Sequence, residues 1–106
     1  MIKIASGQTS TNDWVDYGSG GIYIDVDTSA ANFTTTPHYL VALHGNGYQW
    51  RVSGINAIYN ETPTGFRVYL AWADNDGHSP SNPQNPLRAN FATSRGWYMK
   101  WTGIES

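Results

Sequence analysis

Asp25 and Asp27 are paired carboxylates, and such a pair can perform general acid–base chemistry when the two pKa values differ. They lie on either side of Val26, and Tyr23 comes two positions before Asp25. No neighbouring residue in the sequence supplies the charge or the burial that would separate their pKa values. We therefore expect solvated carboxylates on the face of a strand rather than a catalytic pair.

Residues 74–77, with the sequence DNDG, are similar to the start of a calcium-binding loop. A complete loop needs further oxygen ligands at fixed offsets, including a bidentate Glu at its twelfth position. No acidic residue follows Asp76 before Glu105. We therefore predict a polar turn here, without a metal site, and we predict no cofactor.

The other reactive side chains show no catalytic arrangement. His38, His44 and His78 lie in three separate segments without the spacing of zinc ligands. Cysteine is absent, which excludes a thiol nucleophile and a disulfide, and no serine has the context of a nucleophile elbow. We predict that the protein is not an enzyme, and a small hydrolase is the least supported alternative.

Composition excludes several further classes of function. A chain of 106 residues fits one domain, residues 1–106, with a single modest core. The net charge is −2 and no basic cluster occurs, so nucleic-acid binding is not expected. No apolar run predicts membrane insertion, and no signal peptide is evident at the N-terminus. Only 13% of residues are charged, which is common in extracellular or cell-surface domains that face carbohydrate.

The elements that must position any site are expected to be strands. Apolar and other side chains alternate strictly from Phe66 to Trp72, which indicates a strand with one buried face. Similar patterns predict about six strands, at residues 2–5, 22–26, 39–44, 52–59, 66–72 and 97–104. No segment shows the spacing of an amphipathic helix. We predict an all-β fold, either an antiparallel sandwich or an incomplete barrel.

Two long segments between the expected strands are candidates for function. Residues 13–21 carry Trp14, Tyr17 and three glycines. Residues 74–95 hold three prolines among Asn and Ser residues. A loop of that length in a small domain is usually functional or disordered.

The last expected strand carries large side chains on both faces. Trp97, Met99 and Trp101 share one face, and Tyr98 and Lys100 share the other. If both faces are apolar, one of them is expected to contact another subunit.

The remaining chemistry suits the recognition of sugars. Aromatic rings stack on the apolar C–H face of a pyranose, while Arg, Asp, Asn and backbone groups hydrogen-bond its hydroxyls. Arg51 lies beside Trp50 and Tyr48 at the end of a loop, and Trp72 is a second candidate. Each has a structural alternative, because Trp72 shares the parity of core residues and Arg51 can pair with a nearby carboxylate.

Four motifs in order cover nearly the whole chain. NFTTTP at residues 32–37 precedes an apolar strand, and a central strand begins at Arg51. TPTGF at residues 62–66 is followed by Trp72, and the chain closes with residues 97–105, which contain WTGIE. This set resembles the H-type lectins, the family of snail agglutinins and related GalNAc-binding domains.

The resemblance implies a six-stranded antiparallel β-sandwich that assembles as a trimer or hexamer, with sugar sites between neighbouring protomers. It implies that Arg51 and Trp72 correspond to the sugar-binding Arg and Trp of the family. Ala73 stands where the family has His, so Asp74 is the candidate to take over the hydrogen-bonding role of that His. Asp16 and Gly18 correspond to the Asp and Gly of the family's first loop.

Together these observations predict a non-enzymatic lectin that binds terminal sugars, possible types being GalNAc and Gal. Glycans and further copies of the chain are its expected partners. The second hypothesis is a structural assembly domain, such as a trimeric fibre knob or an appendage module, that keeps the fold without the sugar site. The missing His and the long segment 74–95 favour this second hypothesis.

Overall fold

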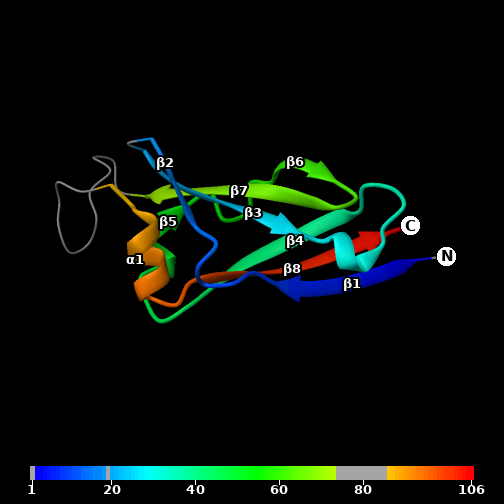
Figure 1. Cartoon of the computed structure of the whole chain (residues 1–106), viewed down its shortest axis with the longest axis horizontal. Helices are drawn as coiled ribbons and strands as arrows, with labels where there is room; N and C mark the ends of the chain where they lie inside the picture. The colour runs from blue at the N-terminus through cyan, green and yellow to red at the C-terminus, as the bar shows by residue number, and fades with distance from the viewer. Residues whose placement is uncertain (1, 19, 74–85) are drawn as a thin grey trace.

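The protein consists of two antiparallel sheets that pack together (Figure 1). The computed structural model describes residues 2–18, 20–73 and 86–106. Within these ranges it has eight strands, two single-turn 3₁₀ helices, η1 (Ser29–Ala31) and η2 (Gln49–Arg51), and one short α-helix. The predicted all-β sandwich is confirmed.

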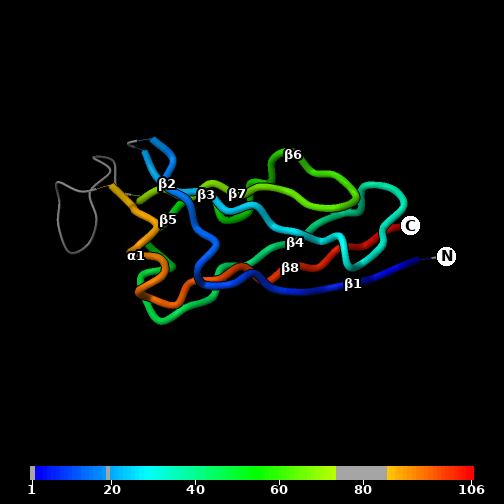
Figure 2. Tube along the Cα trace, in the orientation of Figure 1, coloured from blue at the N-terminus to red at the C-terminus, as the bar shows by residue number. Residues whose placement is uncertain are grey.

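The three-stranded sheet brings the two ends of the chain together. Its strand order is β1 (Lys3–Gln8), β8 (Tyr98–Glu105) and β4 (His38–His44). β8 is central and antiparallel to both neighbours. The two termini therefore lie at the same end of the sandwich, as the chain trace shows (Figure 2).

The five-stranded sheet is organised around β7 (Gly65–Trp72). On one side β7 pairs with β3 (Gly21–Asp27), which pairs in turn with β2 (Val15–Tyr17). On its other side β7 pairs with β5 (Val52–Ser53) and with β6 (Tyr59–Thr62). β2 and β5 consequently lie on opposite edges of this sheet.

The core lies between the sheets and follows from the alternation of side chains along each strand. The buried apolar side chains of β3, β7 and β8 are Ile22, Ile24, Val26, Phe66, Val68, Leu70, Trp72, Met99 and Trp101. Trp97, just before β8, is fully buried and contacts the rings of Trp14, Trp72 and Phe91 edge-to-face. Such pairs add to the stability that area burial provides.

The side chains of the last strand and of Trp97 before it divide between an inner and an outer face, as the sequence predicts. Trp97, Met99 and Trp101 point into the core. Tyr98 and Lys100 lie on the outer face of the three-stranded sheet, where the ring of Tyr98 stacks on that of His44 at a centroid distance of 5.5 Å. The outer face therefore holds a more polar set of side chains than the inner face.

Residues 52–59, predicted as one strand, form two strands with a turn between them. Gly54 has a φ of +99°, in the left-handed region that favours glycine, and the N–H of Ala57 donates to the carbonyl of Gly54 at 3.1 Å. Apolar residues continue through this turn, so the alternating pattern alone does not reveal the break.

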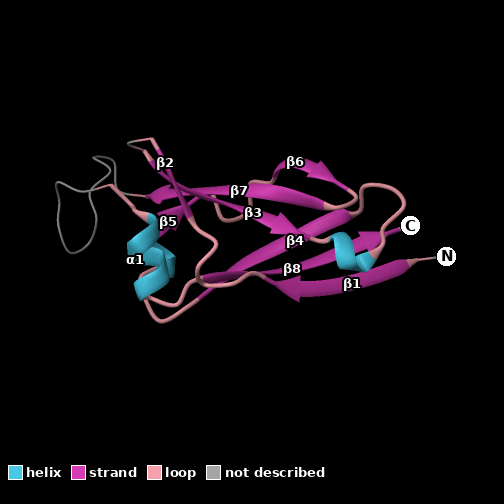
Figure 3. Cartoon of the chain, viewed as in Figure 1, coloured by secondary structure: helices cyan, strands magenta, loops and turns pink. Residues whose placement is uncertain are grey.

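The sequence pattern predicts no helix, yet α1 (Ala89–Ser94) lies within the segment expected to be a long loop. Six residues make fewer than two turns, too few to show helical periodicity. Figure 3 shows α1 at the end of the sandwich opposite the termini. Among the described residues, no helix has the length and hydropathy needed to span a membrane.

Candidate functional site

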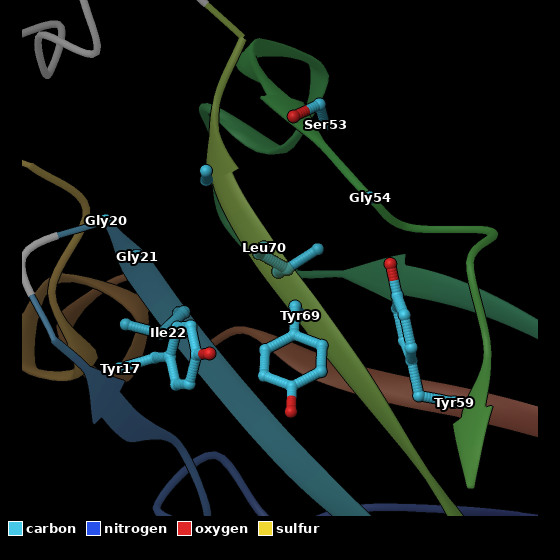
Figure 4. A pocket seen from close by; sticks show the side chains of 10 residues that line it. Tyr17, Gly20, Gly21, Ile22, Ser53, Gly54, Tyr59, Tyr69 and Leu70 are labelled. Carbon is cyan, nitrogen blue, oxygen red and sulfur yellow. The ribbon is translucent and has the colours of Figure 1, made fainter.

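A hollow of about 540 Å³ lies on the outer face of the five-stranded sheet (Figure 4). Tyrosines from three strands line it: Tyr17 of β2, Tyr69 of β7 and Tyr59 of β6. Most of the other residues that line it are small, namely Gly20, Gly21, Ser53, Gly54 and Ala71. We call this hollow the tyrosine groove.

Strand alternation and register place Tyr69 at the centre of the groove. In β7 the side chains of Val68 and Leu70 are buried in the core, so Tyr69 points outward. The antiparallel register sets Tyr69 opposite Tyr23 of β3, and their ring centroids are 5.8 Å apart. Pairing of β3 with β7 thus brings together tyrosines that are far apart in the sequence.

Tyr17 and Tyr59 flank Tyr69 on the two sides. Their ring centroids lie 4.9 Å and 5.0 Å from that of Tyr69, both in edge-to-face geometry. Figure 4 shows the ring of Tyr69 face-on, between the other two. Tyr17 is 55% exposed and Tyr59 48%, so these rings contact solvent and are not part of the core. The result is a row of aromatic rings that a ligand can reach.

Two glycines create the hollow beside this row. A Cβ on Gly54 would run into the carbonyl oxygen of Tyr69, and a Cβ on Gly21 would run into that of Leu70. Glycine at these positions lets the neighbouring backbones approach β7 closely. The tyrosine rings consequently rise above small residues.

An ion pair adjoins the groove on the same outer face. Arg67 donates to both carboxylate oxygens of Asp25, from Nε at 2.7 Å and from Nη2 at 2.9 Å. Its Nη1 donates to the hydroxyl of Tyr69 at 3.3 Å, and its guanidinium carbon lies 4.0 Å from the ring centroid of Tyr23. Arg67 therefore supports both tyrosine rings while Asp25 compensates its charge.

Asp25 and Asp27, considered above for acid–base chemistry, have separate partners. Side-chain hydrogen bonds from Arg67 lower the pKa of Asp25. Hydrogen bonds from Ser29, chiefly from its backbone N–H at 2.9 Å, lower the pKa of Asp27. Both carboxylates are thus held ionised at neutral pH, and neither has the raised pKa of a general acid.

Arg51 and Trp72, the two strongest sequence candidates, lie in different environments. The guanidinium carbon of Arg51 lies 5.3 Å from the ring centroid of Trp50, which is 82% exposed. Trp72 is only 5% exposed and packs edge-to-face against Phe91 and Trp97. Its Nε1 has no hydrogen-bond partner in the described part of the chain. Trp72 therefore packs in the core. The exposed aromatic ring beside Arg51 is that of Trp50.

Asp16 joins the edge of the five-stranded sheet to α1. Its Oδ1 accepts a hydrogen bond from the backbone N–H of Ala89 at 2.7 Å, and its Oδ2 lies 3.7 Å from Nη1 of Arg88. These contacts fasten β2 to the first residues of the helix. In this conformation the carboxylate of Asp16 already serves a structural role.

The sequence candidates that the structure describes are not gathered in one place. Arg51 precedes β5, which pairs with the end of β7 where Trp72 lies. Asp16 and Gly18 belong to β2 and the turn after it, on the opposite edge of the sheet, and Gly18 has a φ of +52°. Asp74 lies outside the described residues.

The tyrosine groove was missed by the sequence reasoning, which looked for aromatic rings beside charged residues. A usable signal was present: Tyr23 and Tyr69 occupy the outward positions of two strongly alternating strands, and Tyr17 and Tyr59 lie in neighbouring segments. Aromatic side chains at outward positions expose apolar surface that strand formation alone does not require. The neighbours within the sheet, however, cannot be read from these positions.

No protein-family model matches the sequence, and no curated protein matches it. The described residues contain no group of three or more His, Cys, Asp or Glu that could hold a metal ion.

Proposed function

We propose that this protein is a lectin-like domain that binds glycans without altering them. The observation that carries the proposal is the tyrosine groove, a row of solvent-exposed aromatic rings above a floor of small residues. A pyranose presents an apolar C–H face and a rim of hydroxyls. Aromatic rings with phenolic hydroxyls complement both features, because a tyrosine has an apolar body and a polar tip.

The groove favours binding over catalysis. Among the described residues that line it, none carries a carboxylate, an imidazole, an amine or a guanidinium. Asp25, a carboxylate on the same outer face, is paired with Arg67. A glycosidase needs two carboxylates that flank the scissile bond, one of them with a raised pKa. The groove supplies contact surface without such a pair.

Assembly as a trimer or hexamer, as in the H-type lectins that the sequence resembles, fits this function. A groove open to solvent binds a short sugar weakly, and several grooves on one rigid assembly raise the avidity through effective concentration. Within the same proposal, sites between protomers take terminal sugars of the GalNAc or Gal type. Arg51 and the exposed ring of Trp50 are the side chains that support such a site. Exposure to glycans further implies an extracellular or cell-surface location.

A glycan array on the purified native oligomer tests the proposal. We expect binding to at least one glycan class, and we expect Tyr59→Ala and Tyr17→Ala to weaken it about tenfold or more. Tyr98→Ala, on the outer face of the other sheet, is the matched control, with sedimentation velocity showing that the variant keeps the native oligomer. Binding lost in Arg51→Ala but kept in both groove variants would place the site at the protomer boundary instead.

The second candidate function is a structural assembly domain. It is favoured by the outer face of the three-stranded sheet, where Ile4 is 67% exposed and Leu40 is 62% exposed. Aliphatic side chains suit contact with another protein better than contact with a sugar. A blank array from a folded oligomer that dissociates in the Leu40→Ser variant would favour this candidate over the lectin.

A further inference from the structure

We propose that the tyrosine groove binds an internal stretch of an uncharged oligosaccharide chain, rather than a terminal monosaccharide or an acidic sugar. This inference depends on the proposed glycan-binding function and specifies its ligand. Three features of the groove, as the described residues form it, support the inference: its length, its open ends and the absence of charged side chains from its lining.

The length follows from the row of rings. Tyr17, Tyr69 and Tyr59 come from three strands, and neighbouring centroids are separated by 4.9 Å and 5.0 Å (Figure 4). A single sugar ring covers only part of such a row, whereas consecutive units of a chain contact one tyrosine after another. Binding free energy should therefore increase as units are added until the row is filled.

A second hollow adjoins the groove at Gly54. This hollow, of about 490 Å³, shares Gly54 with the groove and is lined otherwise by Val52, Ile55, Asn56 and Ala57. Asn56 and Ala57 are exposed, and the side-chain amide of Asn56 has donors and an acceptor for sugar hydroxyls. A chain that leaves the tyrosines beside Gly54 thus meets further surface suited to hydroxyl groups.

The described residues leave the opposite end of the groove open as well. At Gly20, which lines the groove after β2, a Cβ would find no atom within 4 Å. A site specific for a terminal sugar closes around the end of the chain and tests its hydroxyls with convergent polar groups. Here neither end provides such a wall among the described residues, so the geometry suits a chain that passes through.

The uncharged lining of the groove favours neutral over acidic ligands. The described residues that line the groove are uncharged. Two cations adjoin it, and each already has a carboxylate partner. Arg67 forms two hydrogen bonds with Asp25, and Arg88, which donates to the carbonyl of Gly21, lies 3.7 Å from a carboxylate oxygen of Asp16. A sugar carboxylate or sulfate in the groove would lose hydration without gaining a cationic partner, which is unfavourable. Neutral sugars avoid this cost.

The experiment measures binding in solution by isothermal titration calorimetry. Oligomers of glucose, galactose and N-acetylglucosamine, each as mono-, di-, tetra- and hexasaccharide, are the neutral probes. Oligogalacturonates of the same lengths are the acidic counterparts. Short soluble probes report the affinity of one groove, so the avidity of an assembly does not obscure the dependence on length.

We expect one neutral series to bind with an affinity that rises about tenfold or more from the monosaccharide to the hexasaccharide. Tyr17→Ala and Tyr59→Ala should reduce the affinity for the hexasaccharide to near that for the monosaccharide. Asn56→Ala should lower the affinity for the hexasaccharide and leave the affinity for the disaccharide unchanged. Tyr98→Ala, the control on the other sheet, should alter none of these values.

Each other outcome has a definite meaning. Equal affinities for the monosaccharide and hexasaccharide would overturn the inference and leave the glycan-binding function intact. Tighter binding of the oligogalacturonates, or a length dependence that persists in both tyrosine variants, would also overturn it. Failure of every neutral and acidic probe, together with a blank glycan array, would overturn the inference and the proposed function together.

Discussion

The two sheets present outer faces of different chemistry, although one pattern of alternation produces both. The five-stranded sheet shows aromatic rings that contact one another and an ion pair, around a hollow of about 540 Å³. The three-stranded sheet shows the aliphatic side chains of Ile4 and Leu40, the stacked rings of His44 and Tyr98, and a smaller hollow of about 200 Å³ at Leu40.

This difference shows how one sandwich can separate two tasks. Tyrosines offer a sugar apolar surface and a hydroxyl group that can hydrogen-bond. Aliphatic side chains offer apolar surface alone, which another protein surface can cover. The proposed sugar binding therefore belongs to the five-stranded sheet, and the three-stranded sheet is the better candidate for the proposed contact between copies of the chain.

Both outer faces rest on one shared core, and the largest predicted effect concerns that core. Trp97 is fully buried, and its Nε1 donates to the carbonyl of Gly47 at 2.9 Å. Trp97→Ala should lower the free energy of unfolding by about 3–5 kcal/mol, measured by urea denaturation. Trp50→Ala, which removes an exposed ring, should change it by less than about 0.5 kcal/mol. Similar losses in both variants would contradict the assignment of Trp97 to the core.

A second, smaller effect should be specific to the five-stranded sheet. Gly54→Ala places a Cβ against the carbonyl of Tyr69 at a φ that disfavours side chains. We expect a loss of about 1–3 kcal/mol in the free energy of unfolding and weaker glycan binding. Gly20→Ala is the matched control, since a Cβ there meets open space. If both variants have the same free energy of unfolding, the stability of the sheet does not depend on the close approach of the Gly54 backbone to β7.

The third prediction concerns the three-stranded sheet and acid. At the end of β8, hydrogen bonds from Thr35 and Thr34, from backbone and hydroxyl groups, lower the pKa of Glu105 to about 2 from its ordinary 4.5. Because the folded state favours the ionised form, this contribution to stability is present above pH 4.5 and is lost as the pH falls toward 2.

Glu105→Gln should therefore destabilise the protein at neutral pH and flatten the dependence of its unfolding temperature on pH over that range. Thermal unfolding at a series of pH values measures both effects. Glu61→Gln, at an exposed position of β6, is the control and should follow the wild-type curve. A Glu105→Gln curve parallel to that of the wild type would argue against the hydrogen-bonded carboxylate as the source of acid sensitivity.

The smallest predicted effect on stability sharpens the division between the two faces. Leu40→Ser changes an exposed side chain, so the free energy of unfolding should stay within about 0.5 kcal/mol of the wild-type value. The affinity for short oligosaccharides should not change, while sedimentation velocity should show a shift toward smaller species. A loss of oligosaccharide affinity without any change in sedimentation would contradict the placement of sugar binding on the five-stranded sheet.

The site was less predictable than the fold because it depends on pairing between distant strands. The alternation in residues 66–72 places Tyr69 on an outward face, but Tyr17 and Tyr59 approach it only through the order β2-β3-β7 and the pairing of β6 with β7. Sequence alternation fixes the face of each residue and carries no information about the neighbouring strand. The row of rings therefore could not be predicted without knowing how the strands pair.

Arg51 and Trp72 illustrate the same limit. β5 brings their segments together, because Val52, directly after Arg51, pairs with Trp72. Whether Trp72 is exposed depends on Phe91 of α1, a residue of the segment that the sequence pattern describes as a loop. Burial is decided by which distant element packs against a side chain, and the parity of Trp72 could only leave both alternatives open.

By itself, the sequence determined the all-β class and the inward faces of β3, β7 and β8, because the side chains of a pleated strand alternate with a period of two. It also determined the lack of a cysteine framework, because composition does not depend on folding. Only the tertiary structure decided the order of the strands, the break at Gly54 and the meeting of Tyr17, Tyr59 and Tyr69. These features arise from contacts between residues far apart in the chain, and their geometry exists only once both sheets have formed.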